Sequence, residues 1–338
     1  MFNRVFRATA FEFVTPMNSR NRPNIQVVSH GLGCLDGAVA AAVVSHFNPQ
    51  SRITPIFVTN NDTDRALQEL KLAPGVQNEI WITDLSWRCE ATAVHLNQLA
   101  AAGARIYWID HHRSALSRAN APEFRVEFAG KVLSEEFSAA RLAYDYLRQH
   151  RAVAGTGESE AEFFRIVELA DDHDRWVHRL PESARWALAV QALGAHDSYR
   201  SIIRLKRATL SAKLAAAAKA GETAMRLSLE RARATLVEQP LPGGLTLLSA
   251  CCVGFSSEVA FELYRTRRQT VVALFDLRTA GVSLRRSEDC TVDLSQLASS
   301  FGGGGHAAAA GFRMAELCRA PAERLALQLS EKIAVGNP

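Results

Sequence analysis

The sequence predicts an α/β protein with a parallel-sheet N-terminal domain, a helical linker and a smaller α/β C-terminal domain. Two observations lead to this prediction. Short β-branched and aromatic runs alternate with helical patterns between residues 24 and 110, which is typical of parallel βαβ units. A Pro-Leu-Pro-Gly-Gly segment at residues 240–244 then marks a boundary before a second set of strands. The 338 residues are sufficient for two domains.

The composition is that of a soluble globular protein. Hydrophobic residues make up 48% and charged residues 22% of the chain. No apolar run approaches the roughly 20 residues that cross a bilayer. The net charge of +4 permits an anionic substrate without indicating a nucleic-acid coat protein. None of the six cysteines forms a Cys-x-x-Cys pair, which argues against a zinc ribbon or a disulfide framework. We therefore expect a cytoplasmic protein with no membrane partner.

Four strands alternate with helices in the predicted N-terminal domain. The strands are expected at residues 24–29, 53–58, 79–83 and 104–109. Helices should follow the first three strands and extend to about residues 47, 70 and 99, with Gly103 ending the third. Farther along the chain, helices are expected at 134–150 and 160–170, with a loop at 155–159 between them.

Acidic and imidazole side chains follow three of these strands. They are His30 and Asp36, then Asp84, and finally Asp110, His111 and His112. Parallel strands end at one edge of a sheet, where ligands bind in open α/β folds. Each polar strand end could instead be a solvated turn, but their convergence favours an acid- and His-lined cleft. The glycines at 31–37 match neither a dinucleotide fingerprint nor a P-loop.

Two later segments have both a structural and a functional interpretation. Asp171, Asp172 and Asp174 follow the helix at 160–170, as a solvated helix end or as further candidate ligands. Residues 200–234 contain nine basic and two acidic residues and predict one or two long helices. A solvated helix face explains this basic excess better than contact with a phosphate backbone.

The predicted C-terminal domain contains a glycine-rich loop beside an arginine-bearing strand. Strands are expected at 245–251, 270–275 and 281–286, and a helix at 294–301. Four glycines at 302–305 then precede His306. Four consecutive glycines are costly to order, but they allow backbone amides to approach phosphate oxygens. The nearby Arg285 and His306 favour this interpretation over a flexible loop.

These motifs together resemble the DHH phosphoesterase superfamily, in the nanoRNase or oligoribonuclease-like branch that carries the DHH-associated C-terminal domain. The resemblance depends on Asp110-His111-His112 after a strand, on the segment 302–306 and on the segment 309–312. It covers roughly residues 25–312. The implied organisation is an arm at 1–24, a DHH catalytic domain at 25–195, a helical linker at 196–240 and a substrate-binding domain at 241–338.

The resemblance also implies roles for individual residues. The implied metal ligands are His30, Asp36, Asp84, His111 and Asp172, with Asp171 and Asp174 as alternatives to Asp172. The implied catalytic residues are Asp110, which supports the cluster, and His112, which contacts the phosphate. The implied substrate-binding residues are Arg285, Gly303, Gly304, Gly305 and His306.

Cys34 departs from the family pattern, which usually has an aspartate at this position. A thiolate could bind a thiophilic metal such as zinc. Alternatively, the site lacks one ligand and binds its first metal weakly. The sequence leaves both interpretations open.

The implied function is a metal-dependent phosphodiesterase. It would hydrolyse short oligoribonucleotides or linear dinucleotides to mononucleotides, using water activated by two divalent ions. Carboxylates with a few imidazoles suit manganese, with magnesium, iron or zinc as alternatives. Adenosine 3′,5′-bisphosphate and cyclic dinucleotides are alternative substrates, and a homodimer is compatible with the resemblance. The alternative from another class is a nucleotide-binding regulator whose metal site is impaired at Cys34.

Overall fold

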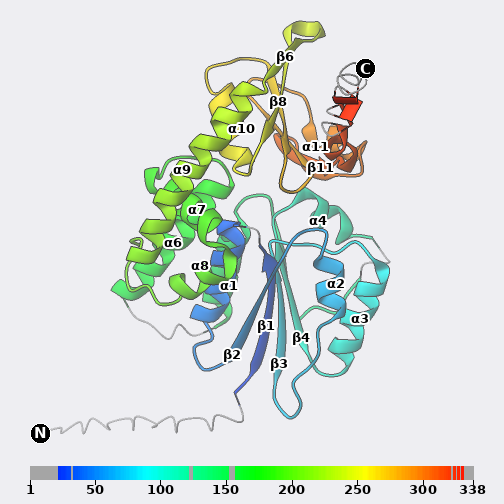
Figure 1. The fold of residues 1–338 in the computed structure, drawn as a ribbon. Coiled ribbons are helices and arrows are strands. Elements are labelled where there is room, and N and C mark those ends of the chain that lie inside the picture. The colour runs from blue at the N-terminus through cyan, green and yellow to red at the C-terminus, as the bar shows by residue number, and fades with distance from the viewer. Residues whose placement is uncertain are drawn as a thin grey trace, which may run out of the picture.

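The computed structural model describes residues 22–31, 33–121, 125–151, 157–320 and six further residues between 323 and 330. Most of the predicted arm, Leu32 of the glycine-rich turn, the start of the loop predicted at 155–159 and residues 331–338 lie outside this part. Two sheets with flanking helices confirm the α/β class (Figure 1). None of the described helices combines the length and apolarity that a membrane crossing requires.

The N-terminal sheet is parallel throughout, with the strand order β2-β1-β3-β4-β5. Its strands are β1 (Asn24–His30), β2 (Arg52–Val58), β3 (Asn78–Thr83), β4 (Arg105–Asp110) and β5 (Gly130–Leu133). Every residue of β3 is buried, as expected for a central strand covered on both faces. Pro55 is compatible with β2 because this strand lies at the edge of the sheet. Only β5 was absent from the sequence prediction.

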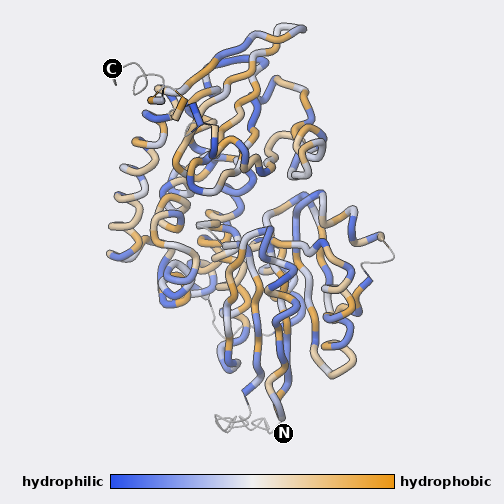
Figure 2. The backbone as a smooth tube through the Cα atoms, turned by 45° about the vertical axis from the view of Figure 1, so that its right-hand side comes forward, coloured by the Kyte–Doolittle hydropathy of each residue, from blue (hydrophilic) through white to orange (hydrophobic). Residues whose placement is uncertain are grey.

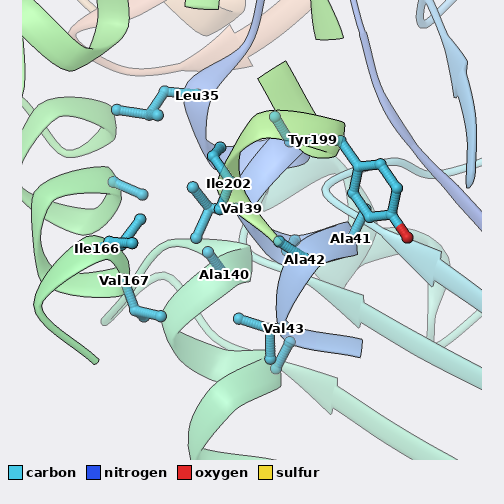
Figure 3. Close-up of a cluster of buried hydrophobic side chains, with 14 of the residues drawn as sticks. Leu35, Val39, Ala41, Ala42, Val43, Ala140, Ile166, Val167, Tyr199 and Ile202 are labelled. Atoms are coloured by element: carbon cyan, nitrogen blue, oxygen red, sulfur yellow. The ribbon is translucent and has the colours of Figure 1, made fainter. Parts of the chain in front are cut away.

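One face of this sheet is covered by α1 (Leu35–His46), whose residues from Leu35 to Val44 are all buried. A helix that is apolar all round must be enclosed. The enclosing layer consists of α5 (Ala139–His150), α6 (Glu158–Asp174) and α8 (Ala195–Ile202). Figure 3 shows Val39 and Val43 of α1 among side chains of these helices. This packing fixes the start of α1, where two candidate site residues lie.

The opposite face packs against shorter helices. These are α2 (Thr63–Gln68), α3 (Glu90–Ala101) and α4 (Arg113–Arg118). Alternating strand residues supply the two cores: Trp81 and Tyr107 face the α1 layer, whereas Ile82 and Trp108 belong to the other. Apolar residues accordingly run along the strands in Figure 2.

Two predicted helix boundaries were wrong. The helix expected from residue 134 begins at Ala139, because both carboxylate oxygens of Asp36 accept hydrogen bonds at its start, from the backbone amides of Ala139 (2.9 Å) and Ala140 (2.8 Å). The helix expected to end at residue 170 continues to Asp174 as α6. The acidic segment therefore lies within a helix rather than beyond its end.

The helical region continues with α7 (Pro181–Leu193) and α9 (Ala212–Ala234), which pack against each other. The prediction of one or two helices at 200–234 is confirmed by α9, while α7 was not predicted. Gly221 permits this close approach: a Cβ there would lie 2.5 Å from the Leu188 carbonyl oxygen. Figure 1 shows α9 running along one side of the molecule toward the C-terminal sheet.

The C-terminal sheet is mixed, with the order β10-β11-β9-β8-β7-β6. Its strands are β6 (Val237–Pro240), β7 (Thr246–Cys252), β8 (Thr270–Asp276), β9 (Gly281–Arg286), β10 (Gly304–His306) and β11 (Ala309–Arg313). Helices α10 (Ser256–Tyr264) and α11 (Leu294–Ser299) accompany it, with short 3₁₀ turns η3 (Pro242–Gly244) and η4 (Ala315–Cys318). The three predicted strands are confirmed as β7, β8 and β9. The glycine segment was expected as a loop, but its second half forms β10.

Candidate active site

The candidate site lies at the carboxyl edge of the parallel sheet, where the order of strand addition reverses between β1 and β3. Ligands bind at this kind of switch point in open α/β sheets. Ser29 pairs with Thr83, and Thr83 pairs with Ile109, so His30, Asp84 and Asp110 follow neighbouring positions. Asp84 has a φ of 58°, which is rare for a residue other than glycine and turns the chain sharply.

Three carboxylates surround the His111 imidazole. Its Nε2 atom lies 3.3 Å from Asp84 Oδ1, 3.4 Å from Asp174 Oδ2 and 3.9 Å from Asp36 Oδ2. This nitrogen is buried and has no hydrogen-bond partner among the described residues. Buried polar atoms are rarely left unpaired. A cation coordinated by the nitrogen and the carboxylates would satisfy all of them.

The second oxygen of Asp84 faces a different group of side chains. Asp84 Oδ2 accepts a hydrogen bond from the Cys34 thiol at 3.3 Å and lies 3.6 Å from His30 Nδ1. Asp84 therefore belongs to both potential metal-binding groups, His30–Cys34–Asp84 and Asp84–His111–His112, and lies beside a third, Asp36–His111–Asp174. The structure thus brings together His30, Asp36, Asp84 and His111, and it adds Cys34 and Asp174 to them.

The electrostatics of the ion-free site show an excess of buried negative charge. Burial, together with the neighbouring charges of Asp84 and Asp174, raises the pKa of Asp36 well above its ordinary value. Burial would also raise the pKa of Asp84, but the neighbouring imidazoles of His111 and His30 outweigh it and hold that pKa well below its usual range. Burial would lower the pKa of His111, but the carboxylates, Asp174 first, raise it to about 11. The carboxylates thus favour a positive charge at this position.

Asp110 positions His112 rather than joining the carboxylates around His111. Asp110 Oδ1 accepts hydrogen bonds from the backbone amides of His111 (2.7 Å) and His112 (3.1 Å) and lies 2.7 Å from His112 Nδ1. Burial would lower the pKa of His112, but the Asp110 charge outweighs it, and the pKa rises to about 9. His112 is therefore held as a cation that faces the cleft.

The three acids at the end of α6 have separate environments. Asp171 accepts a hydrogen bond from the Ser138 backbone amide at 2.7 Å, which caps α5. Asp172 accepts hydrogen bonds from the backbone amide of Arg179 at 2.8 Å and from the Ser183 hydroxyl at 2.6 Å. Of the three, only Asp174 faces His111. The carboxylate of Asp172 is occupied in fixing the turn before α7, so Asp174, the alternative named from the sequence, is the better-placed candidate ligand.

A cavity of about 900 Å³ extends from this cluster to the C-terminal domain. Arg285 and the segment 302–306 form its opposite wall. The Arg285 guanidinium donates a hydrogen bond to the Ser257 hydroxyl at 2.7 Å. The His306 ring stacks on that of His112, with centroids 5.3 Å apart and an interplanar angle of 20°. The predicted substrate-binding residues thus line the same cleft as the metal-binding cluster.

The glycine loop packs so closely that most side chains would not fit at two of its positions. A Cβ at Gly303 would lie 2.1 Å from the Gly311 carbonyl oxygen. Gly305 has a φ of 141°, and a Cβ there would lie 2.6 Å from the Ala309 carbonyl oxygen. Gly304 has no atom within 4 Å of its Cβ position. The glycines at 303 and 305 are therefore required by the packing of β10 on β11.

Sequence reasoning missed several residues of the cleft. Arg88, Arg118, Trp176 and Gln191 all line it. Arg88 lies only four residues after Asp84, and Arg118 lies at the end of the short helix that follows His112. The short distance in sequence from Asp84 and His112 could have indicated that these two arginines line the cleft. Nothing in the local sequence distinguishes Gln191 from the other residues of α7.

Most of the chain is similar in sequence to an oligoribonuclease, although no family model matches it. The relative is the oligoribonuclease NrnB of Bacillus subtilis (strain 168). It is 25% identical over 313 residues, which cover 83% of this chain and 69% of NrnB.

Three solved structures share the fold. A DHH domain from a member of a ribosomal-protein family has a TM-score of 0.60 at 15% identity, covering 87% of this chain and 83% of its own. The pGpG-specific phosphodiesterase PggH of Vibrio cholerae has a TM-score of 0.50 at 14% identity, covering 93% and 99%. RecJ of Thermus thermophilus, solved with Mn²⁺, has a TM-score of 0.51 at 14% identity, covering 89% and 51%. The sequence relative, the shared fold and the Asp110-His111-His112 segment at the end of β4 agree with the resemblance to the DHH superfamily of phosphoesterases.

Proposed function

We propose that this chain is a metal-dependent phosphodiesterase that hydrolyses short oligoribonucleotides or linear dinucleotides to mononucleotides. The observation that carries the proposal is the unpaired His111 nitrogen among three carboxylates of the described structure, at the floor of a cleft whose other wall is cationic. The names of two similar proteins support this substrate class, because NrnB is an oligoribonuclease and PggH a pGpG-specific phosphodiesterase.

Two divalent ions, preferably manganese, fit the residues that face each other. One group would be His30, Cys34 and Asp84, and the other Asp36, Asp84, His111 and Asp174. Bound ions of this kind supply an activated water and neutralise charge on a phosphate. RecJ, which shares the fold, was solved with Mn²⁺. Magnesium, iron or zinc would suit parts of the same donor set.

The chain's own residues would bind and orient the phosphodiester. His112, held as a cation by Asp110, can donate a hydrogen bond to a non-bridging phosphate oxygen. The Arg285 guanidinium is oriented by Ser257 and lies across the cleft from the cluster. The glycine loop lines the same cleft, and its backbone amides can donate hydrogen bonds to the same phosphate.

The test is the substitution Asp84→Asn, assayed with adenylyl dinucleotides and added manganese. Asparagine tolerates the left-handed backbone at this position, so the turn after β3 should be retained. We expect a loss of at least about a hundredfold in rate, because one charged oxygen shared by both groups is lost. The wild-type activity should disappear with a chelator and return with manganese.

Full activity of Asp84→Asn would contradict the metal centre. Wild-type protein that binds dinucleotides tightly but cleaves none, with any of the four metals, would instead support a nucleotide-binding regulator. Including adenosine 3′,5′-bisphosphate and a cyclic dinucleotide in the same assay would separate the two remaining substrate alternatives.

A further inference from the structure

The cleft has a second cationic end, away from Arg285. Arg88 follows β3 and Arg118 ends α4, and both line the cavity. Arg285 is held on the other side by Ser257 of α10, and Figure 1 shows α4 and α10 at different ends of the interface between the domains. Ser86 and Ser114 also line this cavity.

The Arg118 guanidinium and the backbone of Arg88 are held in place without a ligand. The Arg118 Nη1 atom donates hydrogen bonds to Ser86 Oγ at 2.6 Å and to the Trp87 carbonyl oxygen at 2.8 Å. The backbone amide of Arg88 donates to both carboxylate oxygens of Asp64, at 3.2 and 3.0 Å. Binding of an anion therefore requires little further ordering of the Arg118 side chain.

The two guanidinium groups have no counter-ion among the described residues, where no carboxylate oxygen lies within 4.0 Å of either group. Burial and the nearby Arg88 charge both lower the pKa of Arg118. Two like charges facing a solvent-filled cleft repel each other and favour an anion between them. Paired guanidiniums suit a phosphate group, which they can bind through two parallel hydrogen bonds each.

We infer that Arg88 and Arg118 form a second phosphate subsite, which binds the phosphate of the nucleotide next to the scissile one. This inference rests on the proposed function. The scissile phosphate belongs beside His112 and Arg285, whereas Arg88 and Arg118 reach the cleft from the segment after β3 and from the end of α4. The enzyme would accordingly prefer substrates with two phosphates one nucleotide apart.

The test compares three dinucleotides: ApA, with the scissile phosphate alone, and pApA and ApAp, each with one additional phosphate. For wild type, one of the two additional phosphates should lower the Michaelis constant by roughly tenfold or more. The substitutions Arg88→Gln and Arg118→Gln should each remove most of this gain and leave ApA nearly unchanged. Arg88→Lys should restore part of it.

The control is Arg148→Gln, which removes the same charge from an exposed residue of α5 outside the cleft. It should leave all three Michaelis constants unchanged. The inference is overturned if neither additional phosphate helps wild type, if the gain survives in both arginine variants, or if ApA is impaired as much as pApA and ApAp. That last result would assign the arginines to the scissile phosphate.

Failure of the proposed function would look different. If none of the three compounds is hydrolysed, their dissociation constants can still be measured on the metal-free protein by calorimetry. Tighter binding of a two-phosphate compound that is lost in Arg88→Gln would support the subsite, and equal binding of all three compounds would overturn it.

Discussion

At the scale of single residues, the site is organised by carboxylates whose two oxygens have different neighbours. Asp84 faces His111 with one oxygen and Cys34 and His30 with the other. Asp36 has the same double character, since it fixes the start of α5 by two backbone hydrogen bonds and also faces His111. The metal-binding arrangement and the local fold are therefore built from the same atoms.

Asp172→Ala should lower the stability of the protein, whereas Asp174→Ala should lower its affinity for manganese. Asp172→Ala leaves two backbone amides without their acceptor, so the free energy of unfolding should fall by about 1–3 kcal/mol. Asp174→Ala removes one of several mutually repelling carboxylates around His111, so the metal-free protein should keep its stability while manganese affinity falls. Thermal unfolding without metal and manganese titration would measure the two effects. Weaker manganese binding in the Asp172 variant alone would restore the original assignment.

Cys34→Asp separates the two interpretations of the unusual first motif. Aspartate caps helices well, so α1 should still begin at residue 35, where the Cys34 sulfur now accepts from the Gly37 amide. If Cys34 replaces a lost ligand, the variant should bind manganese more tightly and be more active at limiting metal. If Cys34 binds a softer ion, the zinc or iron content of the purified protein should fall.

Metal analysis beside activity titrations would distinguish these results. A variant identical to wild type in both would mean that Cys34 does not contact a metal, despite its thiol lying 3.3 Å from Asp84.

The sequence could predict which segments supply the site but not every residue within them. His30, Asp84 and His111 follow strands, so their meeting at one edge follows from parallel pairing. Asp171, Asp172 and Asp174 lie within one turn of a helix, and only the tertiary position of that helix decides which of them faces His111. Arg88 and Arg118 were missed because arginines are ordinary residues on any protein surface.

At the scale of secondary-structure elements, the β10–β11 pair forms the part of the cleft wall in which a phosphate is proposed to bind. Its geometry depends on Gly303 and Gly305, whose missing side chains permit the close pairing. His306 ends β10 and stacks on His112, which connects this pair directly to the segment after β4. A shift of this hairpin would change the phosphate site without touching the metal-binding cluster.

Gly303→Ala should therefore impair catalysis, and Gly304→Ala should not. The first substitution places a Cβ against the Gly311 carbonyl oxygen, so the strands must move apart. A displacement of about 1 Å in a group that positions the substrate can cost about tenfold to a hundredfold in kcat/KM. The second substitution enters open space. Steady-state kinetics on a dinucleotide would compare them, with circular dichroism as the check on folding. Equal activity of both variants would exclude a requirement for this close packing.

Element boundaries show where local sequence information ends. The start of α5 was predicted five residues too early, since Ser134 is as good a capping residue as Ser138. Asp36, about one hundred residues away in the chain, selects the later start by accepting the first two amides. No window of neighbouring residues contains that information. The short strand β5 is another such case, because its four residues are ordered by pairing with β4.

At the scale of the whole molecule, the cleft is formed by two domains, with the metal-binding cluster on one and the glycine loop on the other. This single cleft has room for few nucleotides. RNAs of two to five nucleotides should therefore be cleaved much faster than a 24-mer, by at least about tenfold in kcat/KM. Rates on a length series of labelled RNAs would measure this. A constant rate out to long single-stranded DNA would favour an exonuclease instead.

The distribution of the site along the chain also has a consequence for protein synthesis. Asp174, the last residue of the metal-binding cluster, leaves the ribosome roughly 110 residues before Arg285, which takes on the order of ten seconds at ordinary rates of elongation. During that interval the nascent chain would carry the candidate metal-binding residues without the opposite wall of the cleft. Under the proposed function, this order of assembly would delay recognition of RNA until the second domain has emerged.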